Sequence, residues 1–368
     1  MQTLASGSSV HQLRASPGNC FWGFFDRDLP PVARVRSGDL VYVETLTHQA
    51  GDAPDLLMDS GTTAVYEAIP PAERGPGVHV MTGPIAVEGA RAGDTLEVRI
   101  LNVEPRLRFG TNIAAWWGYL YDQFRKERIT IYTFDVASRH ARVLFAFDYT
   151  ASELYSLPGI VIPPESTVRK PALRDVVVPL RPHVGVMGVA PPQPGRVNSI
   201  PPGPFGGNLD NWRLGPGATM YYPIFVDEAL FFVGDPHMAE GDGELSGTAI
   251  EASANVWLQL IVRQDLALRS PLLETETHWY THGFDTCPLT ASVPSTPAEV
   301  GFPPAGDLNA AMRMAALEML TFLTDQRGLS ADEAYSLLSV AADFGITQVV
   351  DMRQGVHCGL PRSVFVPR

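Results

Sequence analysis

Apolar and polar positions alternate repeatedly in the first third of the chain. In residues 30–48, PPVARVRSGDLVYVETLTH, they alternate on both sides of a Ser-Gly-Asp turn, and residues 79–105 repeat the pattern around Ala-Gly-Asp. A period of two is typical of strands with one buried face, and Gly and Asp tolerate the backbone of tight turns. The pattern predicts strands on either side of these turns, in sheets packed face to face as a β-sandwich or jelly roll.

Further β-rich segments follow, and helical periodicity appears only near the C-terminus. Strand-like runs occupy residues 129–134, 142–148, 219–233 and 255–262. Residues 158–204 are rich in Pro and Gly, which predicts loops and short strands there. Residues 307–327 repeat apolar positions at helical spacing and end before Gly328. Ser330 begins a capping box that predicts a second helix from 331 to about 344.

These elements together predict a mostly β fold. We expect a jelly-roll or β-sandwich body with two C-terminal helices packed on it. Residues 1–175 are expected to form an N-terminal β-rich half. Residues 176–368 are expected to form a C-terminal half that carries the helices, with both halves packed as one unit.

Composition and charge narrow the class of protein. The 33 glycines and 32 prolines imply many turns, in keeping with a β architecture. The net charge of −13 argues against a nucleic-acid partner, because a phosphate-binding surface needs a basic stripe. The sequence has no run of about 18 apolar residues, so we expect no membrane span. The first residues lack the pattern of a signal peptide. The three cysteines are widely spaced, so we expect no disulfide framework and a cytoplasmic location.

The densest polar segment is residues 234–251, GDPHMAEGDGELSGTAIE, which holds five carboxylates and a histidine between apolar runs. Carboxylates this dense repel one another when buried without a cation. Asp235 and His237 are two residues apart, so a strand or tight turn would aim both at one point. Mixed histidine and carboxylate ligands suit zinc or a similar ion. The alternative interpretation is a solvated acidic hairpin tip.

Three other features carry weaker signals. Residues 204–212 contain Gly206 and Gly207 followed by Asn208, whose backbone amides would hold an oxyanion, although turn chemistry alone also explains them. His79 and His183 are isolated, and an isolated histidine is more often a hydrogen-bonded core residue than a ligand. The aromatic cluster at residues 116–124 is either core or an apolar wall beside a ligand.

The order of several segments resembles the acetamidase/formamidase family of amide hydrolases from Trp22 to about Pro361. The resemblance is carried by residues 22–45, 79–106, 185–191, 205–211 and 332–361, and most specifically by residues 216–251. It implies hydrolysis of the C–N bond of small linear amides to carboxylate and ammonia. Some relatives act on cyclic amides such as γ-lactams. It also implies a homodimer or higher homo-oligomer and a divalent metal, with zinc the usual suggestion.

The chain departs from this family at apolar positions. Relatives often have histidine where this chain has Phe21 and Phe205, and a different residue where it has Met238. If those histidines bind metal or take part in catalysis in relatives, this chain must use a different set of metal ligands or of acid/base residues. Phe205 and Met238 are also expected to contact the substrate and to favour a larger or more hydrophobic acyl group.

A mechanism on these residues follows from the implied activity. Amide hydrolysis needs an activated water, a stabiliser for the oxyanion and an acid for the leaving nitrogen. A metal would serve the first two needs, held by Asp235 and His237 with Asp210 or His79. Glu251 or Glu244 would transfer the proton. The Gly206-Gly207-Asn208 turn would add oxyanion donors.

Glu251 is the sharpest of these assignments. Residues 245–253, LSGTAIEAS, read as a strand leaving the acidic segment, so Glu251 meets Asp235 and His237 if the flanking strands pair. The alternative is a Glu paired with an arginine. Two other functions stay open for the whole chain, a metal-binding jelly roll with other chemistry and a non-catalytic binder of small molecules.

Overall fold

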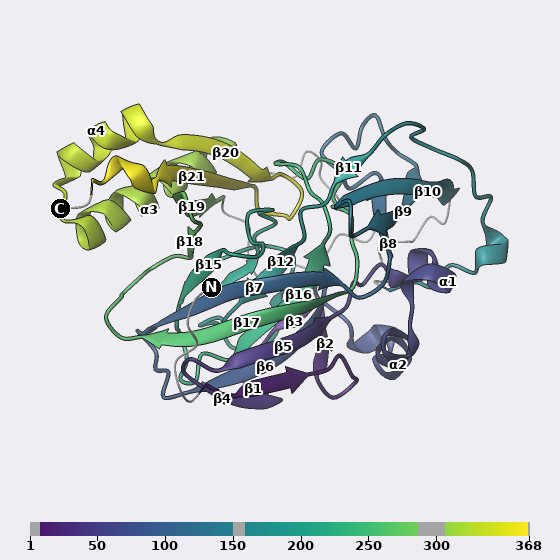
Figure 1. The fold of residues 1–368 in the computed structure, drawn as a ribbon, viewed down its shortest axis with the longest axis horizontal. Helices are drawn as coiled ribbons and strands as arrows, with labels where there is room; N and C mark the ends of the chain where they lie inside the picture. The colour runs from purple at the N-terminus through teal and green to yellow at the C-terminus, as the bar shows by residue number, and fades with distance from the viewer. Residues whose placement is uncertain (1–7, 150–158, 286–305, 367–368) are drawn as a thin grey trace.

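Two large sheets form the body of the molecule (Figure 1). The computed structural model describes residues 8–149, 159–285 and 306–366. The larger sheet has nine strands in the order β1 (Val10–Leu13), β5 (Leu40–Thr45), β17 (Ala254–Arg263), β7 (Thr95–Pro105), β15 (Thr219–Pro223), β18 (Leu272–Glu274), β19 (His278–Phe284), β21 (Gly355–Pro361) and β20 (Asp343–Gln348).

The second sheet has six strands and packs on the first. Its order is β14 (Gly206–Asn208), β12 (His183–Gly188), β16 (Phe231–His237), β6 (Val80–Glu88) and β2 (Cys20–Trp22), with β4 (Ala33–Arg36) parallel to β6. Buried side chains of both sheets belong to one hydrophobic core, among them Val98 and Leu258 of the larger sheet and Ile85 and Val186 of the smaller. The predicted sandwich body is therefore confirmed.

The predicted turns carry the chain from one sheet to the other. The Ser-Gly-Asp turn joins β4 of the six-stranded sheet to β5 of the nine-stranded sheet, and Ala-Gly-Asp joins β6 to β7 in the same way. A third crossing leads from β15 to β16. Flanking strands therefore do not pair as hairpins, and their inward side chains meet across the core.

A smaller sheet covers one end of the body. It has four strands in the order β11 (Val178–Pro179), β10 (His140–Tyr149), β9 (Glu127–Asp135) and β8 (Phe109–Ala114). Its core includes residues of η1 (Ala50–Asp52), α1 (Pro54–Leu57) and α2 (Ser60–Ala68). Figure 1 shows α1 and α2 at the same end. The remaining short elements are β3 (Phe24–Phe25), β13 (Val197–Asn198), η2 (Pro71–Glu73), η4 (Pro164–Ser166) and η5 (Arg362–Val364).

Two helices cover the far end of the nine-stranded sheet (Figure 1). α3 (Leu308–Arg327) begins at its N-cap Asp307 and ends at Gly328, whose φ of 69° favours glycine. α4 (Ala331–Ala341) starts with the predicted capping box. Met319 and Phe322 of α3 share a core with Trp279 of β19, so the predicted packing of the helices on the β body is confirmed. No helix in the described ranges is long and apolar enough to cross a bilayer.

Two short helices, α1 and α2, were not predicted and lie between β5 and β6. Two predictions about elements were wrong. The last helix ends at Ala341, and the residues expected to complete it begin β20. Residues 245–253 form turns and isolated bridges instead of a strand, and β17 starts only at Ala254.

His278 and His282, four residues apart, lie on strand β19 and not on a helix. Both large sheets combine strands from before and after residue 175, and the division of the chain into two halves stays a prediction.

Candidate metal centre and active site

The centre begins at the end of β16, where two polar side chains point to the same side. Asp235 and His237 are both buried, and Asp235 Oδ2 lies 3.1 Å from His237 Nε2. Asp235 has a φ of 51°, a left-handed conformation that is costly for a residue other than glycine. A strained backbone here implies that surrounding contacts hold the carboxylate in place.

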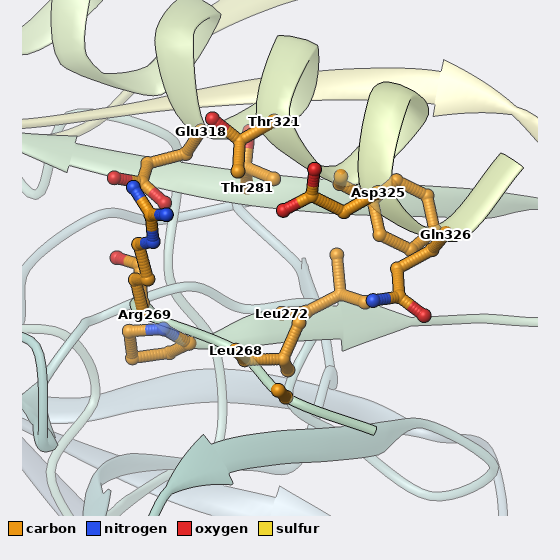
Figure 2. Close-up of a pocket in the computed structure, with 12 residues that line it drawn as sticks. Leu268, Arg269, Leu272, Thr281, Glu318, Thr321, Asp325 and Gln326 are labelled. Atoms are coloured by element: carbon orange, nitrogen blue, oxygen red, sulfur yellow. The ribbon is translucent and has the colours of Figure 1, made fainter. Parts of the chain in front are cut away.

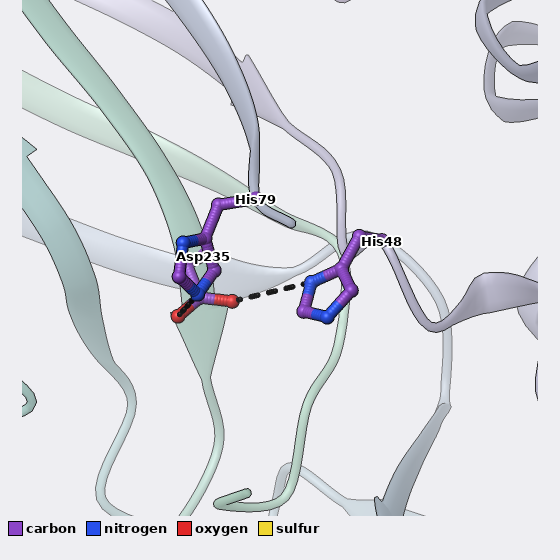
Figure 3. A group of neighbouring side chains, drawn as sticks. All are labelled: His48, His79 and Asp235. Atoms are coloured by element: carbon purple, nitrogen blue, oxygen red, sulfur yellow. Dashed lines mark ion pairs between the residues drawn. The ribbon is translucent and has the colours of Figure 1, made fainter. Parts of the chain in front are cut away.

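Two further histidines face Asp235 from other segments (Figure 3). His79 Nε2 lies 3.6 Å from Asp235 Oδ2, and His48 Nδ1 lies 3.9 Å from Asp235 Oδ1. Burial lowers the pKa of His48 to about 3 and also lowers the pKa of His79, so both rings are neutral at pH 7. His79 Nδ1 is 2.9 Å from Ser199 Oγ, which fixes the ring and leaves Nε2 toward Asp235.

Glu251 approaches the same point from the segment that precedes β17. Its backbone forms antiparallel bridges to His237 and Thr111, and its Oε2 lies 3.2 Å from His237 Nε2. The backbone N–H of Ala249 donates to Oε1 at 2.9 Å. Burial raises the pKa of Glu251 to about 7, although His237 opposes the shift. Glu251 therefore meets Asp235 and His237, and among the described side chains no arginine is paired with it.

More carboxylates surround the other edge of the His237 ring. Asp210 Oδ1 lies 3.9 Å from His237 Nδ1, and Glu240 Oε2 lies 3.3 Å from the same nitrogen. Burial alone would lower the pKa of His237, but Glu251 and Asp235 raise it well above its usual value. Burial also raises the pKa of Asp210 and Glu244. The His237 ring is therefore surrounded by acidic side chains, which raise its pKa and draw cations to this point.

Gly185 on β12 forms the floor of this cluster. A Cβ at this position would lie 2.6 Å from Asp210 Oδ1, 2.7 Å from His237 Cε1 and 2.8 Å from Asp235 Oδ2. Real Cβ atoms essentially never approach heavy atoms that closely. Only glycine leaves room for three polar side chains to meet at this point.

The donor set fits a divalent metal ion. His48, His79 and Asp235 each offer one ligand atom within 4.8 Å of the others, and so do Asp235, His237 and Glu251. In tetrahedral zinc sites such atoms are roughly 3.3 Å apart, as follows from bond lengths near 2 Å. Both ring nitrogens of His48, and Asp235 Oδ1, are buried without a hydrogen-bond partner in the described part of the chain. Neutral imidazoles and carboxylates left free in this way suit zinc or a related ion.

The Gly-Gly-Asn segment lies beside this centre. Gly206, Gly207 and Asn208 form β14 and pair with β12, and both glycines have positive φ. Asn208 is buried, and its Oδ1 has no hydrogen-bond partner among the described residues. Their role in holding an oxyanion stays a prediction.

The two apolar residues predicted to contact the substrate lie in the core of the sandwich. Phe205 and Met238 are fully buried there, and the Phe205 ring packs at 5.1 Å from that of Phe25. Their role as substrate contacts stays a prediction.

Sequence reasoning did not name His48 or Asp351, and it left His183 as an isolated histidine. His48 follows the end of β5, and His183, which had no visible partner in the sequence, lies with its Nε2 2.7 Å from Glu240 Oε2. Asp351 is buried next to Asp210, and both carboxyl groups have raised pKa values. The signal that could have found His48 and His183 is their position at strand ends; the residues they meet are far away in the chain.

Two hollows in the described residues lie outside the cluster. A cavity of about 170 Å³ sits under α3, where Arg269 points toward Glu318 (Figure 2). A wider groove of about 820 Å³ is lined by residues that include Arg181, Trp212 and Arg213. None of the residues lining either hollow is Asp235, His237 or Glu251. We therefore take the buried cluster, and neither of the two hollows, as the candidate active site.

Comparison with known proteins adds independent findings. The model of the acetamidase/formamidase family matches residues 19–197 and 194–366. A formamidase of Methylophilus methylotrophus is 26% identical over 92% of this chain and 88% of its own. A crystal structure of a predicted acetamidase/formamidase from Thermoanaerobacter tengcongensis is 25% identical, with a TM-score of 0.73 over 97% of both chains. That of an acetamidase from Bacillus halodurans is 29% identical, with a TM-score of 0.69 over 96% of this chain and 98% of its own.

Proposed function

The chain belongs to the acetamidase/formamidase family, and we propose that it hydrolyses the C–N bond of a small amide to a carboxylate and ammonia at the Asp235–His237 centre. The observation that carries the proposal is the buried meeting of three histidines and several carboxylates above Gly185. The polar atoms of a core histidine or carboxylate normally form hydrogen bonds, whereas neither ring nitrogen of His48 has a hydrogen-bond partner among the described residues. The names of the relatives, formamidase and acetamidase, support amide hydrolysis as the reaction.

His48, His79 and Asp235 are the residues that would hold a divalent metal, with zinc as the candidate ion. When bound, such an ion supplies an activated water at neutral pH and polarises a carbonyl oxygen. The two imidazoles are neutral, as metal binding requires, because burial lowers their pKa values. His237, expected as a ligand from the sequence, shares a neighbouring group of possible ligand atoms with Asp235 and Glu251, and another with Asp210 and Glu244.

Glu251 is the residue that moves the proton. Its pKa of about 7 suits a group that accepts a proton from water and then gives it to the leaving nitrogen. Water oxygen forms the bond to the amide carbon, the C–N bond breaks, and the nitrogen departs as ammonia with the transferred proton. Glu244 is the second candidate for this role, because it lies in the same buried group as His237.

Asn208 and the two glycines that precede it on β14 are our candidates for the donors that face the negative charge developing on the amide oxygen. Preorganised donors and charges of this kind lower the barrier most when they are buried. We assign oxyanion stabilisation to this side of the centre.

Substrate identity within the amides is open between linear amides and γ-lactams. The experiment is ammonia release from formamide, acetamide, propanamide and longer amides by the metal-analysed protein, with ring opening followed for 2-pyrrolidone. Release that depends on bound metal supports the proposal. No turnover of any amide by protein carrying a full complement of metal would refute it. The homo-oligomer and the cytoplasmic location remain predictions, to be measured by sedimentation and by fractionation.

A further inference from the structure

A second pair of buried carboxylates lies on the wall next to Glu251. Asp52 is 6% exposed and accepts a hydrogen bond of 2.7 Å from the Thr111 hydroxyl. The backbone of Thr111 is in turn bonded to that of Glu251 in both directions, at 2.9 and 2.7 Å. One residue therefore separates Asp52 from the proposed proton-transfer group.

Glu127, at the start of β9, is the other member of the pair. It is 3% exposed, and its Oε1 accepts a hydrogen bond of 3.2 Å from the indole N–H of Trp116. Its Oε2 is buried with no hydrogen-bond partner among the described residues. The charge of Asp52 acts on Glu127, in addition to burial, to raise its pKa. Ala53, next to Asp52, and Trp116, which bonds Glu127, belong to the same hydrophobic cluster, so the two carboxylates lie on one wall.

No basic side chain within the described ranges forms an ion pair with Asp52 or Glu127. Burial raises the pKa of Asp52 to about 7 and that of Glu127 to about 8. A buried carboxylate without a counter-charge is destabilising unless something neutralises it. Residues 8–149, 159–285 and 306–366 bring no such group to this wall.

Gln49 provides an independent observation on the same wall. It is 5% exposed, and neither its amide nitrogen nor its amide oxygen has a hydrogen-bond partner in the described part of the chain. Gln49 is the N-cap of η1, three residues before Asp52. In a 3₁₀ turn, residues three apart lie over one another, so the free amide and the carboxylate share a side. A buried amide with all its bonds unmade indicates a polar ligand.

We propose that Asp52, Glu127 and Gln49 form a subsite for a positively charged nitrogen group, so that the preferred substrate is an amide carrying an ammonium or guanidinium group at its other end. The inference rests on the proposed amide hydrolysis for its substrate and on the unpaired groups for its charge. Two carboxylates suit a cation with several N–H donors, and the Gln49 oxygen adds an acceptor. Trp116, which holds Glu127, adds an aromatic surface that attracts cations.

The test uses pairs of amides that differ only at the terminal group. 4-Aminobutanamide and pentanamide have the same number of heavy atoms, but one ends in an ammonium group and the other in a methyl group. Shorter and longer pairs cover the unknown spacing, from glycinamide with propanamide to 5-aminopentanamide with hexanamide. We expect at least one pair to favour the ammonium member by about tenfold or more in kcat/KM, the usual size of a charge-assisted contact.

Glu127→Gln keeps the shape and removes the charge, so the ratio within that pair should fall toward one. Glu67→Gln changes an exposed glutamate on α2 and should leave the ratio unchanged. If every pair favours the methyl member in the parent enzyme, the inference is wrong, and the apolar preference expected from Phe205 and Met238 gains support. This result needs no variant, so misfolding of Glu127→Gln cannot obscure it.

Calorimetric binding of the same pairs separates this inference from the proposed function. Tighter binding of the ammonium member without turnover of either would overturn amide hydrolysis and keep the subsite. Turnover of both members at equal rates would keep hydrolysis and overturn the subsite. Equal binding with no turnover would overturn both.

Discussion

Two glutamates near opposite ends of β17 are equally buried but have different charged neighbours. Glu97 on β7 pairs with Ile261, and Glu251 lies three residues before the strand begins. Each is 2% exposed. Glu97 is bound by Arg99 at 2.6 Å and by Arg263 at 2.7 Å, whereas Glu251 faces His237 and other carboxylates. The difference lies in the partners and not in the burial.

The comparison separates a structural acid from a functional one. A carboxylate that only stabilises the fold brings its own cations, because desolvation without them costs several kcal/mol. Around Glu251, the carboxylates outnumber the cations, and Asp52 and Glu127 continue the imbalance. Such an arrangement is retained where a metal ion or a substrate supplies the missing charge.

Of the changes predicted here, removal of metal from the centre around Glu251 should reduce amide hydrolysis the most. Dialysis against a chelator, checked by elemental analysis, is expected to reduce ammonia release to background, and added zinc should restore it. His79→Gln should reproduce the loss by lowering the bound metal, while His140→Gln, at the half-buried first residue of β10, should not. Full activity in metal-free protein would remove the metal from this account.

Filling the floor of the centre is the next most severe change. Gly185→Ala places a Cβ within 2.8 Å of three polar side chains, so we expect kcat/KM to fall by at least about 100-fold. Gly241→Ala is the matched control, because a Cβ there meets nothing within 4 Å. Equal activity of the two variants would show that the reaction takes place elsewhere.

A change at Glu97 should lower the stability of the protein and leave its activity unchanged. Glu97→Gln removes the charge that holds Arg99 and Arg263, and since both arginines are partly exposed we expect a loss of about 1 to 2 kcal/mol. Chemical denaturation measures this value. Turnover of the folded variant should match the parent enzyme, and a large drop in turnover would blur the distinction between the two ends.

The smallest effect concerns pH and Glu127. The pKa of about 8 in the folded protein lies above the ordinary glutamate value of 4.5, so the contribution of Glu127 to stability is full below about pH 4.5 and is lost as the pH rises through 8. Glu127→Gln cannot ionise. The melting temperature of the variant minus that of the parent should therefore increase between pH 5 and pH 9. An exposed control, Glu67→Gln, should show a flat difference, and a flat difference for Glu127→Gln would place its pKa near the ordinary value.

The sequence predicts those parts of the fold that depend on local patterns. Alternation gave the strands around the Ser-Gly-Asp and Ala-Gly-Asp turns, and helical spacing with the Ser330 capping box gave α3 and α4. α2 was missed because it is only nine residues long and begins with Ser-Gly-Thr-Thr, which favours helix poorly. Which strands pair is a tertiary property, so no local pattern shows that these turns cross between sheets.

The site divides in the same way. Asp235, His237 and Glu251 come from one short segment, so their density and spacing already indicate chemistry. His48, three residues after β5, and His183, the first residue of β12, reach the cluster only through the packing of the two sheets. The expected strand through Glu251 was wrong, yet its backbone bridge to His237 still produces the meeting that the strand was expected to give.

The most direct test measures ammonia release by Glu251→Gln and Glu97→Gln side by side, on the best amide substrate and at equal metal content. Both changes replace a buried carboxylate by an amide of the same shape. Loss of the proton-transfer group should lower turnover by roughly 100- to 10,000-fold in Glu251→Gln, while Glu97→Gln stays near the parent enzyme. Turnover of Glu251→Gln equal to that of Glu97→Gln, with metal retained in both, would contradict the assignment of catalysis to this centre.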